Sequence, residues 1–444
     1  MANTISVLMK KEEILEILVD WNFWQRELNT GIKREGYVDR AGNFLKTNMI
    51  LSILGVRRSG KSFIMRQIAK TLIDSGLDSK ETLIINFEDR RFKDFSVNVL
   101  DEILDTYLEF IKPDSVPYIF VDEVQLVDRW ERWARTINEL QKAKLIVSGS
   151  TSQIISKELA TTLTGRHLDL KVFPLSFKEF LKFKKIEIRN SLDIINKKIE
   201  LRRSFREYAQ YGGFPEVVLG ESKNEILISY FEDILTKDIV KRFSVKKIDK
   251  LEALAKFYLT NISNSITFNS LGRALKISKD TVEKYSWYLE NAFLFFFIKR
   301  FSYSLKEQDN SPRKVYSLDV GLSNALGFRF SENFGKVMEN IAAVELLRRA
   351  AQNPLMEIYY WKDVSGKEVD FVVKEGIEVK GLIQVTYASS KEEIAERELS
   401  ALIKAIKEFK LKEGLVLTEE FEGEEEVNGL VLKYKPLWKW LLAG

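Results

Sequence analysis

The sequence predicts an α/β protein whose first domain is built on a parallel sheet. Short apolar runs alternate with segments of helical spacing over the first third of the chain, and a glycine-rich turn joins the first run to the first helix. Such an alternation is typical of parallel strands covered by helices. The expected strands are residues 48–56, 82–87, 118–121 and 144–148, and the expected helices are residues 62–75, 98–111 and 130–141.

Composition limits the class of protein. The 444 residues predict several domains at roughly 150 residues each. With 45% hydrophobic and 30% charged residues, the chain is expected to fold. It contains no cysteine and a single histidine, His167, which excludes disulfide scaffolds, zinc fingers and multi-histidine metal sites. A net charge of +4 makes any basic surface local. Without an apolar run of ~18 residues, we expect a cytoplasmic protein without membrane contact.

Three further domains are expected after the first, which we place at residues 1–183. Residues 184–245 contain long charged helices at 191–207 and 225–242. Residues 246–313 contain helices at 251–261, 269–275 and 278–291 and a strand at 294–301, an order typical of a winged helix-turn-helix. In residues 314–444 we expect a smaller α/β domain, and residues 306–313 and the acidic run 419–426 are predicted to be loops.

The glycine-rich turn is the strongest functional signal. Residues 55–62, GVRRSGKS, fit the pattern G-x-x-x-x-G-K-[ST] between an expected strand and an expected helix. In such a phosphate loop, backbone N–H groups surround the phosphates of ATP, the lysine reaches the β and γ oxygens, and the serine hydroxyl binds Mg²⁺. The expected nucleotide contacts are Gly55, Val56, Arg57, Arg58, Ser59, Gly60, Lys61, Ser62 and Phe63.

Two acids end a later apolar strand, YIFVDE at residues 118–123. Behind a phosphate loop this is the Walker B arrangement, in which Asp122 holds Mg²⁺ with Ser62 and Glu123 polarises the attacking water. The catalytic residues are therefore predicted to be Lys61, Glu123 and an arginine discussed next.

The next strand ends in residues 148–151, SGST, beside the predicted acids. We expect Ser150 or Thr151 to sense the nucleotide, with an ordinary helix cap as the alternative. Arg166 follows a glycine and is the candidate arginine finger, acting either on its own nucleotide or on that of a neighbouring chain. Its alternative role is a surface ion pair, and His167 is expected to be structural.

The predicted helix-turn-helix carries a local basic surface. Its second helix presents cations near its N-terminal half, where lysines would meet DNA phosphates and a threonine would approach the bases. A packing role between larger domains is the alternative. The candidate DNA contacts are Arg273, Lys276, Lys279, Thr281 and Lys284.

Several strings together resemble one family. They are the phosphate loop, VDEVQ at 121–125, SGS at 148–150, TGR at 164–166, FPLSFKEF at 173–180 and GGFPE at 212–216. The chain resembles AAA+ superfamily ATPases of archaea and bacteria in which a helical linker leads to a winged helix and a restriction-endonuclease-like domain. The resemblance covers the chain from about residue 9 to the end.

The resemblance implies a nuclease core in the last domain. Such a core needs a glutamate on a helix, an aspartate at a strand start and an acid-x-lysine on the adjacent strand, so that carboxylates bind Mg²⁺. Glu339 and Asp370 match the first two requirements. For the third, residues 378–380, EVK, have the right letters, but hairpin register places Asp370 opposite residues 381–385 and so selects Gln384. Thr386 then stands where a lysine is needed.

The predicted function is an ATP-driven machine that couples nucleotide state to DNA through the winged helix and the nuclease-like domain. The alternatives are a nucleotide-gated switch that binds a protein partner, and an ATP-regulated metal-dependent nuclease. The mismatch at Gln384 and Thr386 leaves both an active and a degenerate nuclease open. Formation of a homo-oligomer also stays open.

Overall fold

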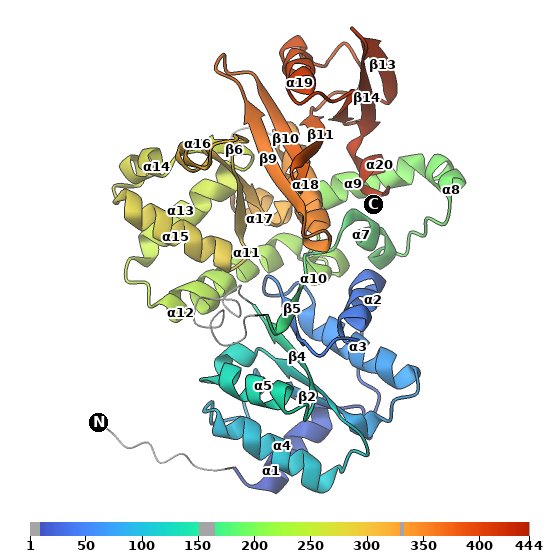
Figure 1. The fold of residues 1–444 in the computed structure, drawn as a ribbon, viewed down its shortest axis with the longest axis vertical. Helices are drawn as coiled ribbons and strands as arrows, with labels where there is room; N and C mark the ends of the chain where they lie inside the picture. Colours follow the sequence, from blue (N-terminus) through green and yellow to red (C-terminus); the bar gives the residue numbers. More distant parts are fainter. Residues whose placement is uncertain (1–8, 151–164, 329–332, 444) are drawn as a thin grey trace. The chain divides into compact units, whose positions relative to one another are not determined.

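The computed structural model describes residues 9–150, 165–328 and 333–443. Thr151 and part of the TGR string lie outside the described residues. The chain divides into two compact units, Met1–Val172 and Phe173–Gly444. In Figure 1 the first unit is coloured blue to teal and the second green to red. None of the described helices is long and apolar enough to cross a membrane.

The first unit contains a five-stranded parallel sheet in the order β2-β3-β4-β1-β5. The strands are β1 (Ile50–Leu54), β2 (Thr82–Asn86), β3 (Tyr118–Asp122), β4 (Lys144–Gly149) and β5 (His167–Lys171). The helices are α1 (Lys11–Trp21), α2 (Glu35–Phe44), α3 (Lys61–Asp74), α4 (Asn98–Phe110) and α5 (Trp130–Glu139). The predicted parallel α/β domain is confirmed. Because β1, β4 and β3 are parallel neighbours, the turn after β1 and the acids at the end of β3 lie at the same carboxyl edge of the sheet.

The second unit begins with a helical region and a small antiparallel sheet. The helices are α7 (Phe177–Phe183), α8 (Ser191–Asn196), α9 (Lys198–Tyr211), α10 (Pro215–Leu219), α11 (Lys223–Asp233), a π-helical segment Ile234–Val240, α12 (Lys241–Phe243), α13 (Ile248–Thr260), α14 (Phe268–Leu275), α15 (Lys279–Asn291), α16 (Leu305–Asn310) and α17 (Val320–Leu326). The sheet has the order β6-β8-β7, formed by β6 (Asn264–Ile266), β7 (Phe295–Ile298) and β8 (Arg313–Ser317).

A mixed six-stranded sheet completes the second unit, in the order β13-β14-β12-β11-β10-β9. Its strands are β9 (Met356–Lys362), β10 (Glu368–Glu375), β11 (Glu378–Val385), β12 (Glu413–Thr418), β13 (Gly423–Val427) and β14 (Leu430–Pro436), with helices α18 (Phe334–Gln352), α19 (Glu396–Glu408) and α20 (Leu437–Leu441). In β10 and β11, Phe371 pairs with Ile383, which confirms the predicted hairpin register.

Two loop predictions were wrong. Residues 305–310 form α16, which Ser304 caps by accepting a hydrogen bond from the Glu307 N–H. The acidic run contains the edge strand β13, whose three glutamates pair with β14. Glu425 there forms an ion pair with Lys391, so neighbouring lysines offset the charge that made this segment look like a loop.

The PLSF and GGFP strings contact each other within the second unit. The Leu175 N–H donates to the Gly213 carbonyl at 2.7 Å, and the buried Asp319 carboxylate accepts from the N–H groups of Gly213 and Gly321 at 2.7 and 2.8 Å. A Cβ on Gly212 would lie 1.8 Å from Asp319 Oδ1, so only glycine fits there. Leu175 therefore packs with the second unit, which begins at Phe173.

Candidate functional site

The phosphate loop joins β1 to α3 at the carboxyl edge of the first sheet. A Cβ at Gly55 would lie 2.1 Å from the Val172 carbonyl oxygen, and Gly60 has a φ of +98°. Glycine is therefore required at both ends, by close backbone approach at one and by a left-handed conformation at the other. The pattern recognised in the sequence thus forms a strand, a turn and a helix N-terminus, as a phosphate site requires.

Lys61 lies inside this loop. Its Nζ donates to the carbonyl oxygens of Gly55 at 3.0 Å and Val56 at 3.3 Å, and it lies 3.9 Å from Glu123 Oε1. The side chain is only 4% exposed. A buried ammonium held by neutral carbonyls keeps most of its charge available for an anion.

Ser148 joins the two acids that follow β3. Its hydroxyl donates to Asp122 Oδ1, and its oxygen accepts the Glu123 N–H at 3.1 Å. Burial and the neighbouring Glu123 raise the pKa of Asp122, while hydrogen bonds from Ser148 and Ser62 oppose the rise. Gln125 donates its amide to Glu123 Oε2. The predicted pair of acids is thus buried and held in place beside Lys61.

The nucleotide-sensing role expected of Ser150 stays a prediction, and a different serine of the same string contacts the two acids. Ser150 is buried, but the contact with both acids comes from Ser148, two residues earlier. Ser148 faces Asp122 because β4 is the immediate neighbour of β3. The SGS string contained this signal, since Ser148 lies in β4 and Ser150 directly follows it. Residues two apart in an extended chain point to the same face, so the string alone did not tell which serine contacts the acids.

Arg166 lies at the opposite edge of the sheet from the phosphate loop. His167, the next residue, pairs with Ile50 at the start of β1, whereas the phosphate loop follows the end of this five-residue strand, about 16 Å away at 3.3 Å per residue. The Arg166 guanidinium lies 3.0 Å from Glu139 Oε1. An arginine finger acting on the nucleotide of its own chain is therefore inconsistent with this position. Action on a neighbouring chain stays a prediction.

Other loop residues have distinct surroundings. Arg57 forms an ion pair with Glu88 at 2.7 Å, and Arg58 has a left-handed φ of 68°. Ser59 is completely buried, and Phe63 is 41% exposed at the start of α3.

Arg34 is a residue of this site that the sequence analysis missed. It is buried, and its guanidinium donates to the Ser59 carbonyl at 3.0 Å and lies 4.5 Å from the centre of the Tyr37 ring. Its backbone N–H donates to Gln67 on α3 at 3.0 Å. The segment before the sheet thus supports the phosphate loop, but no local motif around residue 34 indicates this.

Four of the five predicted DNA contacts gather at one hollow of about 550 Å³. Arg273, Lys276, Lys279 and Thr281 line it, together with Lys247, which the sequence analysis did not select. The fifth predicted contact, Lys284, lies on α15 with Lys279 and Thr281. Its ammonium is 5.7 Å from the centre of the Tyr288 ring, and it does not line the hollow.

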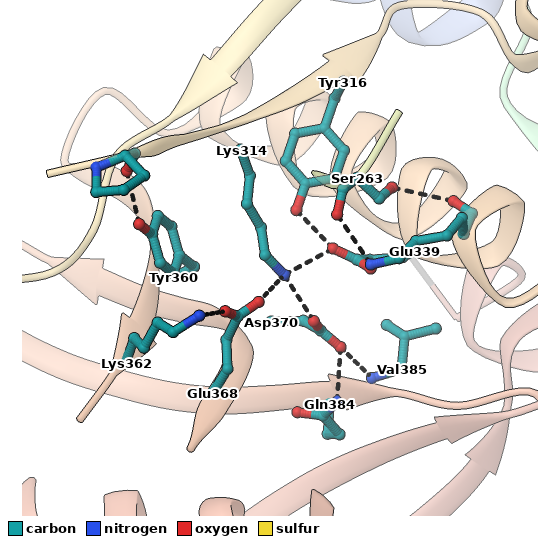
Figure 2. Close-up of polar contacts among 12 residues, drawn as sticks. Ser263, Lys314, Tyr316, Glu339, Tyr360, Lys362, Glu368, Asp370, Gln384 and Val385 are labelled. Carbon is teal, nitrogen blue, oxygen red and sulfur yellow. Dashed lines mark hydrogen bonds and ion pairs between the residues drawn. The ribbon is translucent and has the colours of Figure 1, made fainter. Parts of the chain in front are cut away.

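The predicted nuclease residues also come together, but around a lysine (Figure 2). Lys314 Nζ lies 2.9 Å from Glu339 Oε1 and 2.8 Å from Asp370 Oδ1, and Gln384 donates its side-chain N–H to Asp370 Oδ2 at 2.8 Å. Burial and Glu339 raise the pKa of Asp370 to about 6, while Lys314 opposes the rise. Thr386 supplies no cation to this site, but β8 contributes one, Lys314, which the sequence pattern did not indicate.

Comparisons with known proteins agree with this description. An uncharacterized protein of Methanocaldococcus jannaschii is 34% identical over 411 residues, which cover 89% of each chain. An uncharacterized protein of Haemophilus influenzae is 30% identical, covering 92% of this chain and 98% of the relative. Residues 47–181 match the family described as AAA domain. The chain belongs to a family of AAA-domain P-loop ATPases.

The remainder of the chain matches families without an assigned role. Residues 202–333 and 334–437 match two domains of unknown function, DUF8612 and DUF4143. Among solved structures, a Walker-type ATPase of Pyrococcus abyssi is similar at 14% identity with a TM-score of 0.43, over 67% of this chain and 96% of that chain.

Proposed function

We propose that the protein binds ATP with Mg²⁺ at the phosphate loop and hydrolyses it. The contact of Ser148 with both Asp122 and Glu123 carries this proposal, because it fixes the two acids beside Lys61. Phosphoryl transfer depends on positioning and on charge neutralisation more than on covalent chemistry by the protein. Glu123 would orient and polarise the attacking water, and Lys61 would stabilise the charge on the phosphates.

The residues present suit a magnesium ion. The Ser62 side chain, at the N-terminus of α3, is one of the groups that oppose the rise in the pKa of Asp122, so two hard oxygen donors lie near each other there. When bound, Mg²⁺ would neutralise phosphate charge there. Burial and the neighbouring Glu123 raise the pKa of Asp122, and a bound cation would stabilise its charged form.

Steady-state ATP hydrolysis with Mg²⁺ tests this proposal. Lys61→Ala should abolish ATP binding, and Glu123→Gln should bind ATP without hydrolysing it. Lys70→Ala is the matched control. Lys70 also lies on α3, but its side chain is partly exposed and forms ion pairs with Glu27 and Asp74 instead of contacting the phosphate loop. Normal turnover by Glu123→Gln would remove Glu123 from the role of base.

We further propose that residues 246–313 form a winged helix that contacts DNA. The hollow beside α14 and α15 supports this proposal, because four cations, Lys247, Arg273, Lys276 and Lys279, line one concave surface with Thr281. The helices α13, α14 and α15 and the strands β6, β7 and β8 follow in the chain order of that fold, with α16 inserted between β7 and β8 and with β8 running on to Ser317. Phosphate oxygens of a duplex are the ligands that such a surface fits.

Fluorescence anisotropy with a labelled duplex tests the DNA contact. Arg273→Gln and Lys279→Gln should weaken binding, and each should lower the slope of log affinity against log salt by about 0.9. Lys256→Gln is the control, since Lys256 pairs with Glu252 on α13 and does not line the hollow. Unchanged affinity in both variants, with no stimulation of ATP turnover by DNA, would favour the nucleotide-gated switch that binds a protein partner.

A role of Arg166 on the nucleotide of a neighbouring chain has its own test. Such a role requires a homo-oligomer, so turnover per chain should rise with protein concentration, and Arg166→Ala should remove that rise. Losing an arginine finger typically costs on the order of 10³ in rate. If Arg166→Ala keeps full activity at high protein concentration, Arg166 is not an arginine finger, and its role is the ion pair with Glu139.

A further inference from the structure

The cluster around Lys314 is defined by the three carboxylates that its ammonium contacts (Figure 2). Lys314 Nζ lies 2.7 Å from Glu368 Oε1, 2.8 Å from Asp370 Oδ1 and 2.9 Å from Glu339 Oε1, and its side chain is 1% exposed. Burial by itself would lower the pKa of Lys314, but Asp370 and Glu339 outweigh it and raise the pKa. Lys314 is therefore a buried cation at the centre of the cluster.

Every carboxylate oxygen of the cluster has a donor. Besides the three bonds to Lys314, Glu339 accepts from Tyr316 at Oε1 and from Lys336 at Oε2, Asp370 Oδ2 accepts from Gln384 and the Val385 N–H, and Glu368 Oε2 accepts from Lys362. Three ammonium groups thus balance three carboxylates.

These residues do not fit a divalent cation. Mg²⁺ needs several oxygen lone pairs directed at one point, and here those lone pairs accept hydrogen bonds. Gln384 points its N–H, not its carbonyl, toward Asp370, because two facing acceptors would repel each other. Among the residues that the structure describes, no group of three or more His, Cys, Asp or Glu is arranged to hold a metal ion.

We propose that the Lys314 ammonium takes the place of a divalent cation and that the cluster is a metal-free joint between the two sheets of the second unit. Lys314 belongs to β8 of the small sheet, whereas Asp370 and Gln384 belong to β10 and β11 and Glu339 to α18. The joint would make the small sheet and the six-stranded sheet one body. This inference is independent of the proposed ATP hydrolysis.

Further contacts surround the cluster and hold the same elements. Asn340 pairs with the Ser317 backbone on β8, accepting its N–H and donating to its carbonyl, both at 2.8 Å. The Phe301 N–H donates to the Tyr360 carbonyl at 2.6 Å, which extends the chain after β7 along β9. Tyr360 also donates its hydroxyl to the Pro312 carbonyl just before β8, at 2.6 Å. The small sheet is thus attached to the C-terminal sheet on both sides of Lys314.

Manganese binding tests whether Lys314 replaces a metal. Mn²⁺ is titrated into nucleotide-free full-length protein, and free Mn²⁺ is read by electron paramagnetic resonance. Wild type and Asp370→Asn should bind equal amounts, whereas Lys314→Met should gain about one site. Binding by wild type that Asp370→Asn removes would overturn the proposal, as would a folded Lys314→Met that gains no site. Cleavage of supercoiled plasmid by wild type but not by Asp370→Asn would also overturn it.

Amide hydrogen exchange tests the joint. Lys314→Met should lose protection in β8 and in β9 and β10 together, because three carboxylates lose their shared partner. Lys380→Met is the matched control, since Lys380 pairs with Glu378 at the exposed end of the β10–β11 hairpin and should change neither sheet. Loss restricted to one of the two sheets contradicts the joint. If Lys314→Met does not fold, Glu339→Gln is measured in its place. This variant should also lose protection in both sheets, and loss in only one sheet would again contradict the joint.

Discussion

The buried carboxylate of Asp319 should make the stability of the second unit depend on pH. Burial raises its pKa from 3.8 to about 6, although the N–H groups of Gly213 and Gly321 oppose the rise. At 1.36 kcal/mol per pKa unit, this difference corresponds to about 3 kcal/mol. Because the folded state keeps the proton at pH values where the unfolded chain has released it, this contribution is fully present below about pH 4 and is lost as pH rises through about 6.

Urea unfolding of wild type and Asp319→Asn, measured between pH 4 and pH 7.5, isolates this contribution. Asparagine cannot accept both backbone N–H groups, so the variant should be less stable than wild type at low pH. The free energy of unfolding of the variant lacks the Asp319 titration, so its deficit relative to wild type should shrink by about 2.4 kcal/mol from pH 4 to pH 7.5. Asp309→Asn is the control, because Lys299 lowers the pKa of Asp309 and moves its pH dependence below this window. A deficit that stays constant across the range would refute the reasoning.

Three further predictions concern the phosphate loop. Gly55→Ala should abolish binding of a fluorescent ATP analogue, because its methyl group would lie 2.1 Å from a backbone carbonyl oxygen. Ser148→Ala should lower kcat at least tenfold in steady-state assays while leaving ATP affinity similar, because a hydrogen bond to a charged group is worth about 1.5–3 kcal/mol and here also positions Glu123. Arg34→Ala should weaken ATP affinity several-fold in a binding titration with unchanged circular dichroism, since it loses the Ser59 carbonyl; unchanged affinity would contradict a supporting role.

The features that the sequence predicted are those that depend on neighbouring residues. The phosphate loop needs only a contiguous stretch, because the strand, the turn and the helix N-terminus follow one another along the chain. The facing of Asp370 and Gln384 was also accessible, since a tight hairpin fixes its own register and Phe371 indeed pairs with Ile383.

The features that the sequence did not predict join distant segments. Arg34 reaches Ser59 across 25 residues, and Lys314 reaches Asp370 across 56. Neither lies in a recognisable pattern, because an arginine before a helix and a lysine on a short strand are ordinary surface residues in a sequence. The nuclease pattern expects its lysine on β11. In the structure the cation is Lys314 instead, because β8 lies against α18 and β10.

The two buried lysines therefore differ in what they leave for a ligand. Lys61 is bonded to two neutral carbonyl oxygens and lies 3.9 Å from a single glutamate, so a phosphate gains a charge partner by displacing neutral acceptors. Lys314 lies within 2.9 Å of three carboxylates whose remaining oxygens are also paired. An anion or a metal ion would have to break balanced ion pairs there without a gain in charge compensation. Residual charge thus favours ligand chemistry at the phosphate loop and a structural role at Lys314.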